Sequence, residues 1–592
     1  MTSSDYRDHV TENTVERLHD AHIGSGYAPS QSRVPYRNIR QLLSLHATVT
    51  PEKDFLIHYN AAGEREHFTY AEFNSLVHQA AGFLYDDLGV RAGDRVATLG
   101  YNHSSLVILY FACWLIGATV APQNSAEEDR RIAFILRNSE AVICFVFADY
   151  LERAEHIIHG TDEGLGASNI RQIVQIGGEA DGRYSHFNSE ILNRPNTFIS
   201  TDERPSIDAE ALLVYTSGTT GQPKGVVLSQ YNLLVDAQGI AQWHGITGGQ
   251  RLMNVLPIHH VNGIVVTLIT PLFAGASTVL NRAYSSSFFW KRIADEGVQI
   301  VSVVPTLLQF SLDYAEEQAR HGLSIWGEGI ERHDLRRFRY LICGAGTLAM
   351  SLVHAFEEMF AIQILHGYGL SETTCYSCFL PIDLSWQEHR HWLLDYGYPS
   401  IGCPIEPNEM AIFSADGSGV QLAEGERGEI CCRGHNVMKY YFKRPDANAE
   451  TFKFGWFRTG DEGFYHTDAQ GRKFFFISGR IKELINRGGV KFSPFDIEEI
   501  LLSIDGVKVG LAVAFKNDYY GEEVGAYIVL DEGVTLDEQT ILAHCRSKMS
   551  FEKSPKVVIF GTEIPVTTTG KYQRLRLQPL FSEWEHTQFK RS

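Results

Sequence analysis

The sequence lacks the signatures of several protein classes. Nine cysteines are scattered over 592 residues, an odd number that argues against a disulfide framework. There is no fixed-period repeat and no low-complexity tract, and apolar residues at 44% with charged residues at 21% exclude a largely disordered or collagenous chain. Basic residues number 52 against 71 acidic ones, so the net charge of −19 disfavours general nucleic-acid binding, although a local pocket for a small anion stays open.

Long hydrophobic runs are also scarce. The one candidate, residues 106–122, is only 17 residues long, contains Gly117 and ends at Pro122. Because a membrane helix needs about 20 apolar residues, this run predicts a buried helix leading into a core strand, and no membrane span. The first residues, MTSSDYRDHV, have no secretory pattern, and the last, FKRS, are not a peroxisomal address, so we expect a cytoplasmic location.

What is present is an alternation of helices and strands. Residues 1–33 are polar and predict a loosely held N-terminal arm. From Val34 onward, apolar segments alternate with helical periodicity, with a helix expected at 70–88. Strands are expected at 95–100, 141–147, 299–304 and 339–343. This pattern predicts a large α/β domain of mainly parallel sheets with helices, over residues 34–479.

A second, smaller domain is expected at residues 480–592. Strands at 507–515 and 524–530 and a helix at 535–549 predict an α+β unit. The boundary falls at the short polar turn Gly479–Lys482, which suits a hinge better than a long linker.

The most informative segment is Tyr215–Gly225, YTSGTTGQPKG, which lies between two apolar runs. Its glycines allow close backbone approach to a ligand, and its hydroxyls and lysine can bind phosphate oxygens. It is not a P-loop, because Lys224 follows Pro223 and precedes a glycine. The predicted phosphate-binding residues are Thr216, Ser217, Gly218, Thr219, Thr220, Gly221 and Lys224.

Two other patterns are weaker. Residues 344–349 fit G-x-G-x-x-A after a predicted strand, but the next strand ends in His-Gly-Tyr and lacks the acidic residue of a dinucleotide site. Cys375 and Cys378 form C-x-x-C without a second pair of ligands, so we expect packing near a pocket and no zinc site.

Five segments together resemble the ANL superfamily of adenylate-forming enzymes, in its acyl- and aryl-CoA synthetase branch. They are YTSGTTGQPKG, HGYGLSET (366–373), WFRTGD (456–461), GRIK (479–482) and TTTGKYQR (567–574), in the order that the family uses. The resemblance extends from about Val34 to the end of the chain. It implies the ANL fold, with a large N-terminal domain and a small mobile C-terminal one.

The resemblance also implies a reaction and a set of roles. A carboxylate attacks the α-phosphate of ATP, giving an acyl-adenylate and pyrophosphate. Negative charge then accumulates at one phosphorus, which requires cations and fixed donors. The implied roles are Mg²⁺ binding by Glu372, an α-phosphate contact by Ser371, adenine stacking by Tyr368 beside Gly344, Ala345 and Gly346, ribose binding by Asp461, a nucleotide contact by Arg480, and bridging of carboxylate and α-phosphate by Lys571.

The resemblance further implies a second half-reaction. The small domain is expected to rotate about Lys482 and to exchange the Lys571 loop for the loop at Gly488 and Gly489. These glycines would leave space for the pantetheine arm of coenzyme A. Its thiol then attacks the adenylate, giving a thioester and AMP.

The acid pocket is expected around Met253–Gly263. This segment has no acidic residue to hold an α-ammonium group, so an amino acid substrate is disfavoured. His260 matches a position where related ligases carry a gate residue beside the carboxylate, although a satisfied interior histidine is the alternative. Asn486 stands where luciferases carry a second lysine, which weakens a light-emitting function. The expected pocket residues are His260, Val261, Asn262, Gly263, Cys343 and Tyr376.

The sequence therefore predicts an AMP-forming acid:CoA ligase that uses ATP, Mg²⁺ and coenzyme A on a fatty or aryl acid. The alternative is a stand-alone enzyme that loads the acyl group onto a separate phosphopantetheinyl carrier protein. A catalytically silent nucleotide-binding protein is a third reading, which the presence of Lys224, Glu372, Asp461, Arg480 and Lys571 opposes. Whether the acid is fatty, aryl or dicarboxylic stays open, as does the oligomeric state.

Overall fold

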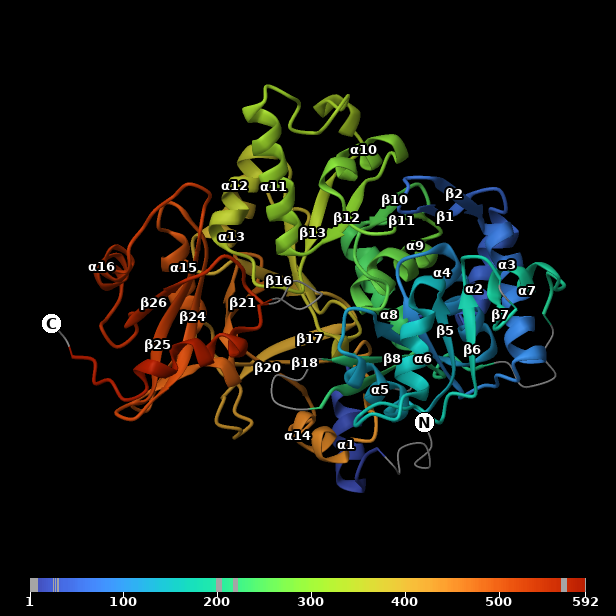
Figure 1. Ribbon diagram of the computed structural model, residues 1–592, viewed down its shortest axis with the longest axis horizontal. Coiled ribbons are helices and arrows are strands. Elements are labelled where there is room, and N and C mark those ends of the chain that lie inside the picture. Colours follow the sequence, from blue (N-terminus) through green and yellow to red (C-terminus); the bar gives the residue numbers. More distant parts are fainter. Residues whose placement is uncertain are drawn as a thin grey trace.

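Three β-sheets organise the computed structural model (Figure 1), which describes residues 9–24, 26, 28, 31–180, 182–198, 205–216, 222–565 and 572–590. Two sheets and most helices form a large N-terminal domain, and the third sheet forms a small C-terminal domain, drawn in orange to red. The predicted α/β fold class is confirmed.

The helices are α1 (Glu12–Ala21), α2 (Ile39–Val49), α3 (Tyr70–Gly82), α4 (Ser104–Ile116), α5 (Asp129–Asn138), α6 (Leu151–His159), α7 (Phe187–Leu192), α8 (Gln230–His244), α9 (Thr270–Ala274), α10 (Ser286–Glu296), α11 (Pro305–Arg320), α12 (Met350–Phe360), α13 (Trp386–Leu394), α14 (Pro445–Thr451), α15 (Pro494–Leu502) and α16 (Glu538–Lys548).

The first sheet has eight strands. In order across the sheet they are β19 (Tyr440–Tyr441), β9 (Lys224–Ser229), β8 (Glu210–Thr216), β4 (Thr119–Asn124), β3 (Arg95–Gly100), β5 (Ala141–Phe147), β6 (Gln172–Ile176) and β7 (Ser185–His186). Strands β4 to β7 pair in parallel, whereas β8, β9 and β19 pair antiparallel. The antiparallel edge matters for function, because it contains the strands on either side of the glycine-rich loop.

The second sheet has thirteen strands. In order they are β17 (Asn408–Phe413), β18 (Gly428–Gly434), β20 (Phe457–Thr467), β21 (Lys473–Arg480), β16 (Ser400–Pro404), β15 (Cys378–Phe379), β14 (Ile364–Tyr368), β13 (Tyr340–Cys343), β12 (Ile300–Val303), β10 (Arg251–Asn254), β11 (Ser277–Asn281), β1 (Asp54–Tyr59) and β2 (Arg65–Thr69). Strands β11, β10, β12, β13 and β14 pair in parallel with one another, whereas β14 pairs antiparallel with β15. In open parallel sheets, ligands bind beyond the carboxyl ends of the strands, which here lead into residues 304, 344 and 369.

The long apolar run predicted to be a buried helix is α4. Every residue from Ser104 to Ile116 is buried, the His103 side chain caps its start, and Gly117 ends it at φ 80°, before strand β4. Among the described residues, none of the helices has the length and apolar character that crossing a bilayer requires.

The small domain is built on a five-stranded sheet. Its strands are β23 (Val490–Phe492), β22 (Ile485–Arg487), β25 (Gly521–Leu530), β24 (Val507–Asn517) and β26 (Val557–Phe560), the last of which pairs in parallel with β25. Helices α15 and α16 enclose an apolar core of their own with this sheet. A short helical turn at Ile481–Glu483 connects it to β21 of the large domain.

Polar contacts join the two domains in this arrangement. Asp496 of α15 accepts a hydrogen bond from the Tyr398 hydroxyl and lies near Arg427, while Lys508 pairs with Asp313 at 3.3 Å. Glu499 of α15 accepts a hydrogen bond at 3.4 Å from the backbone N–H of Met350, the first residue of α12. Hydrogen bonds and ion pairs therefore contribute to the contact between the two domains.

The N-terminal arm differs from the prediction. Residues 9–24 are not loosely held: they contain α1, and Val10, before the helix, and Leu18 and Ala21, within it, are buried in the core of the large domain. The prediction failed because most residues of this segment are polar, and its few apolar residues at helical spacing form only a short stripe. Other boundaries moved by small amounts; the helix expected at 70–88, for instance, is α3 followed by a wider π-helical turn at Phe83–Asp87.

Candidate active site

The strands on either side of the glycine-rich loop bring a lysine to a carboxylate. Thr216 ends β8 and is paired across the ladder with Lys224, the first residue of β9. The Lys224 ammonium lies 4.7 Å from the centre of the Tyr441 ring, and burial lowers its pKa although the Glu372 charge opposes that shift. The Tyr441 hydroxyl donates to Glu372 Oε1 at 2.7 Å. Tyr441 therefore links the predicted phosphate-binding lysine to the predicted Mg²⁺ ligand.

Glu372 itself lies in the short helical turn Ser371–Thr373 that follows β14. The turn ends at Thr374, whose φ of 66° is unusual for a β-branched residue and reverses the chain toward Cys375. The backbone N–H of Met438 donates to the Glu372 carbonyl at 2.7 Å. Backbone and side chain of Glu372 are thus both held by the segment that leads into β19.

A second polar cluster lies where β20 and β21 meet β14. Asp461 and Arg480 are cross-strand partners, and Arg480 Nε lies 3.1 Å from Asp461 Oδ1, a pairing that raises the Arg480 pKa. The Tyr368 hydroxyl donates to Asp461 Oδ2 at 2.7 Å. Three residues predicted to contact the nucleoside are therefore assembled around one carboxylate, whose two oxygens can each accept a further hydrogen bond.

The glycine loop after β13 lies against Tyr376. A Cβ at Gly344 would stand 2.5 Å from the Tyr376 hydroxyl and 2.8 Å from the Gly367 carbonyl, so only glycine fits there. Ala345 has φ 65°, which keeps the loop tightly turned. A Cβ at Gly346 would be 3.2 Å from Pro305, a tight contact. The loop thus lies between the Tyr368 strand and the predicted acid pocket.

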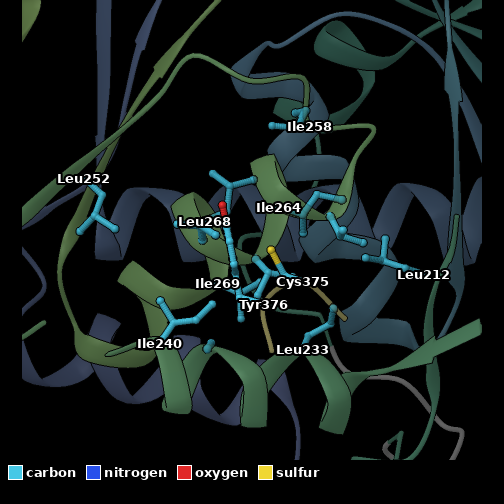
Figure 2. Packing of buried hydrophobic residues seen from close by; sticks show 14 of the residues in the cluster. Leu212, Leu233, Ile240, Leu252, Ile258, Ile264, Leu268, Ile269, Cys375 and Tyr376 are labelled. Atoms are coloured by element: carbon cyan, nitrogen blue, oxygen red, sulfur yellow. The ribbon is translucent and has the colours of Figure 1, made fainter. Parts of the chain in front are cut away.

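The predicted acid pocket contains a buried polar chain. Ser302 of β12 donates from its hydroxyl to Asn262 Oδ1 at 2.7 Å, and Asn262 Nδ2 donates to the Tyr376 hydroxyl oxygen at 3.1 Å. All three side chains are buried. Cys343 is buried on β13, and a Cβ at Gly263 would be 2.5 Å from the Pro257 carbonyl oxygen. Figure 2 shows Tyr376 and Cys375 packed with Ile264 and Leu268 of the adjacent helical segment.

His260 lies at the entrance to this segment. Its ring centre is 4.4 Å from that of His259, and both side chains are half-buried. The two histidines directly precede Val261, the N-cap of the π-helical stretch Asn262–Ile269. Burial, with some help from His260, lowers the His259 pKa well below its ordinary value, so that ring is neutral. π-Helical turns occur often at functional sites, where they change the direction of side chains.

A buried carboxyl group lies behind the Glu372 turn. Asp236 of α8 is fully buried; its Oδ1 accepts from Asn436 Nδ2 at 3.0 Å, and its Oδ2 accepts from the Tyr376 N–H at 3.4 Å. Asn436 Nδ2 also approaches the carbonyls of Thr373 and Tyr376. Desolvation raises the Asp236 pKa to about 8, so the group is mostly neutral at pH 7.

Cys375 and Cys378 are both buried. Burial raises the pKa of both thiols well above the ordinary value. Within the part of the chain that the structure describes, the one group with metal-ligand spacing is His58, Glu66 and His103, which contains no cysteine and lies outside the site.

Some predicted site residues are placed elsewhere or lie outside the described residues. Gly488 and Gly489, at φ 60° and 90°, form the two-residue turn between β22 and β23 of the small domain, where the Gly488 N–H donates to Tyr520. Lys482 lies in the connecting turn between the domains. The residues outside the described part are Ser217, Gly218, Thr219, Thr220, Gly221 and Lys571.

Sequence reasoning missed four residues that hold the site together: Ser302, Asn436, Met438 and Tyr441. None belongs to a recognisable motif. The available signal was the aromatic run at 440–442 soon after an Asn-Val-Met sequence, which by itself reads as an ordinary buried strand.

Comparisons with known proteins agree with this geometry. The AMP-binding enzyme family matches residues 43–442, and the AMP-binding enzyme C-terminal domain matches residues 496–571. The oxalate–CoA ligase of Arabidopsis thaliana is 32% identical over 86% of this chain and 92% of its own length. The sulfoacetate–CoA ligase of Cupriavidus necator is 31% identical over 92% of this chain and 97% of its own length.

Solved structures give the same fold. The anthranilate CoA ligase AuaEII in complex with anthranoyl-AMP aligns with a TM-score of 0.79 at 24% identity, covering 93% of this chain and 98% of that one. The o-succinylbenzoate CoA synthetase of Bacillus subtilis, bound to its acyl-adenylate, aligns with a TM-score of 0.74 at 25% identity over 92% and 98% of the two chains.

Proposed function

Because the chain belongs to the AMP-binding enzyme family and is an AMP-forming acid:CoA ligase, we propose that the clusters around Glu372 and Asp461 perform its adenylation step. ATP and coenzyme A are its co-substrates. The observation that carries the assignment is the chain Lys224–Tyr441–Glu372 on one side and Tyr368–Asp461–Arg480 on the other. The first can hold phosphates and a cation, and the second can hold a ribose.

In the proposed first step, a carboxylate oxygen of the acid forms a bond to the α-phosphorus while the bond to the bridging oxygen of pyrophosphate breaks. Lys224 supplies a fixed positive charge to the phosphates, and Lys571 brings the two anions together. Asp461 accepts hydrogen bonds from the ribose hydroxyls, and Arg480, 3.1 Å away, holds that carboxylate in position. Tyr368 and the Gly344–Gly346 loop enclose the adenine.

Mg²⁺ is part of the proposal. Glu372 offers the hard oxygen ligand that this ion prefers, with Oε1 already oriented by the Tyr441 hydroxyl. The proximity of Lys224 fits a site in which phosphate oxygens complete the coordination. When bound, the ion would neutralise charge on the phosphates. Ser371 adds a hydroxyl beside it.

The second step is proposed to follow a rotation of the small domain about Lys482. The turn at Gly488 and Gly489 then replaces the Lys571 loop, and the coenzyme A thiolate attacks the acyl carbonyl with AMP as the leaving group. The left-handed φ values at both glycines support a turn without side chains, which lets a pantetheine arm pass. The domain limits 34–479 and 480–592 belong to this proposal.

We further propose that the acid is short and polar. The buried Ser302–Asn262–Tyr376 chain lies among the predicted pocket residues, and Tyr376 lies against Gly344. A long acyl chain that entered between these residues would have to displace this polar chain and leave its members unpaired, which is costly. The similarity to oxalate– and sulfoacetate–CoA ligases supports a short polar acid among the fatty, aryl and dicarboxylic classes that the sequence leaves open.

The test is release of AMP and pyrophosphate across short dicarboxylic and sulfonated acids, fatty acids and aryl acids, with and without coenzyme A. We expect coenzyme-A-dependent AMP release with a short acid, and Lys571→Ala should cost about 3 kcal/mol or more in the first step. Preference for a fatty or aryl acid would overturn the substrate class. Pyrophosphate release that ignores coenzyme A would favour a carrier-protein acceptor. The cytoplasmic location stays a prediction, testable by cell fractionation.

A further inference from the structure

The N-terminal segment, residues 9–24, packs on the segment that positions Glu372. We call residues 434–443 the β19 segment, since it leads into and contains β19. Helix α1 lies against β18 and α14, near the foot of the molecule in Figure 1. A Cβ at Gly24 would stand 2.4 Å from the Pro407 carbonyl oxygen and 2.9 Å from the Gly434 Cα, so the two backbones touch. The arm is therefore docked closely along its whole described length.

His22, directly after α1, makes the central contact. Its Nε2 lies 2.9 Å from the Met438 carbonyl oxygen, and the side chain is buried. A carbonyl can only accept, so Nε2 carries the proton and donates it. Burial is the main cause that lowers the His22 pKa to about 4, so the ring stays neutral, with one fixed donor, across the physiological range.

Met438 connects His22 to Glu372, the proposed Mg²⁺ ligand. Its N–H donates to the Glu372 carbonyl at 2.7 Å, while its carbonyl accepts from His22. Three residues further on, the Tyr441 hydroxyl holds Glu372 Oε1. The β19 segment thus contacts both the backbone and the side chain of Glu372, and His22 in turn donates a hydrogen bond to that segment.

His9 holds the other end of the β19 segment. Its ring stacks on Tyr440 at 4.7 Å and 14°, and its Nδ1 accepts from the Lys443 N–H at 3.0 Å. Its carbonyl accepts from Asn448 Nδ2 at 2.8 Å. The two histidines therefore fix the strand on either side of Tyr441.

These contacts come from residues that precede the family match, which begins at residue 43. We propose that the N-terminal segment is a positioning element for adenylation: through Met438, His22 fixes the orientation of Glu372 and so tunes the use of MgATP. This inference rests on the proposed role of Glu372. His22 acts through Met438 and touches no substrate, so it is a positioning residue.

The test compares His22→Ala with His22→Gln in the full-length enzyme, using His19→Ala as the matched control. The Gln side chain can place an N–H close to where His22 Nε2 lies, whereas Ala removes the donor. His19 lies on the exposed face of the same helix. The measurements are the Mg²⁺ concentration for half-maximal pyrophosphate release, the KM for the acid, and the rate of AMP release from preformed acyl-adenylate with coenzyme A.

We expect His22→Ala to raise the Mg²⁺ concentration for half-maximal pyrophosphate release by about fivefold, the effect of losing one hydrogen bond, without changing the coenzyme A step. His22→Gln should recover most of this loss, and His19→Ala should match the wild type. His9→Ala, at the other end of the segment, should move the same quantity, and serves if His22→Ala does not fold.

Two results would overturn the inference. One is a wild-type Mg²⁺ response in a folded His22→Ala or His9→Ala protein; the other is an equal loss in both half-reactions, which indicates general destabilisation. Glu372→Gln, measured alongside, separates the proposals. If it leaves the Mg²⁺ response unchanged, the assignment of Glu372 fails and this inference fails with it; if only Glu372→Gln shifts the response, this inference alone fails.

Discussion

The Tyr441 hydroxyl donates to Glu372 Oε1 at 2.7 Å while the Lys224 ammonium lies over the face of the same tyrosine ring. One aromatic side chain thus contacts both a cation and a carboxylate. A direct lysine–carboxylate ion pair would neutralise both groups, whereas this arrangement would leave Lys224 for phosphates and Glu372 for a metal ion, the roles that we propose for them. On that proposal, the charged groups are in position before ATP binds.

Tyr441→Phe should therefore impair adenylation specifically. The variant loses a hydrogen bond to a charged group, which contributes about 2 kcal/mol, so pyrophosphate release should slow roughly 10- to 30-fold and need more Mg²⁺. Tyr440→Phe is the matched control, because the neighbouring Tyr440 hydroxyl also binds a carboxylate, Glu210, on a different side of the strand. The measurement is the rate of pyrophosphate release. If that rate falls equally in Tyr441→Phe and Tyr440→Phe, this role for Tyr441 is contradicted.

Asp461→Asn should raise the KM for ATP. The amide keeps the shape of the carboxylate but offers one accepting oxygen in place of two, and Arg480 loses its charged partner at 3.1 Å. We expect about a tenfold or greater increase in the KM, with the KM for the acid unchanged. Glu462→Gln, one residue away and bonded to the Ser478 hydroxyl, controls for general damage to β20. An unchanged KM for ATP would remove Asp461 from the nucleotide site.

The parts of this site that the sequence could predict are those in which contiguous residues carry the chemistry. Glu372, Asp461 and Lys224 stand within short motifs whose composition suits phosphate, ribose and metal. Ser302, Asn436 and Tyr441 could not be found in that way, because each reaches the site through tertiary contacts between segments far apart in the chain. The same limit explains why α1 was not predicted: it has few apolar residues, and only the folded structure shows which surface they cover.

Asp236→Asn should change how stability depends on pH. Burial raises the Asp236 pKa from 3.8 to about 8, so between these values the folded protein keeps a proton that the unfolded chain releases. The stability contributed by this protonation is complete below pH 3.8, declines as pH rises through that window, and is lost above about 8.

Since a full proton corresponds to about 1.4 kcal/mol per pH unit, the wild type should lose stability relative to Asp236→Asn as pH increases from 5 to 8. Urea unfolding of both proteins across that range gives the difference directly. Parallel curves would mean that Asp236 is ionised in the folded protein. Pyrophosphate release should survive in the variant, because the Asn oxygen can still accept from Asn436 Nδ2, and only the longer 3.4 Å contact with the Tyr376 N–H is lost.

Glu499, at the domain interface, is another carboxyl group whose pKa is raised. Glu499 accepts from the Met350 N–H, and burial, with a smaller contribution from the Glu498 charge, raises its pKa from 4.5 to about 7. The docked arrangement therefore favours the protonated form. Its stabilising effect is complete below pH 4.5 and is lost as pH rises through about 7, so docking of the small domain should weaken across that range.

Trypsin can report this weakening, because the connecting segment carries Arg480 and Lys482. Cleavage at this segment, normalised to a peptide substrate at each pH, should accelerate in the wild type between pH 6 and 8, whereas Glu499→Gln, which cannot ionise, should stay slow. Glu532→Gln, at an exposed small-domain carboxylate, should follow the wild type. If Glu499→Gln accelerates as much as the wild type, docking of the small domain does not respond to this group, and other contacts, such as that of Asp496 with the Tyr398 hydroxyl, hold the interface.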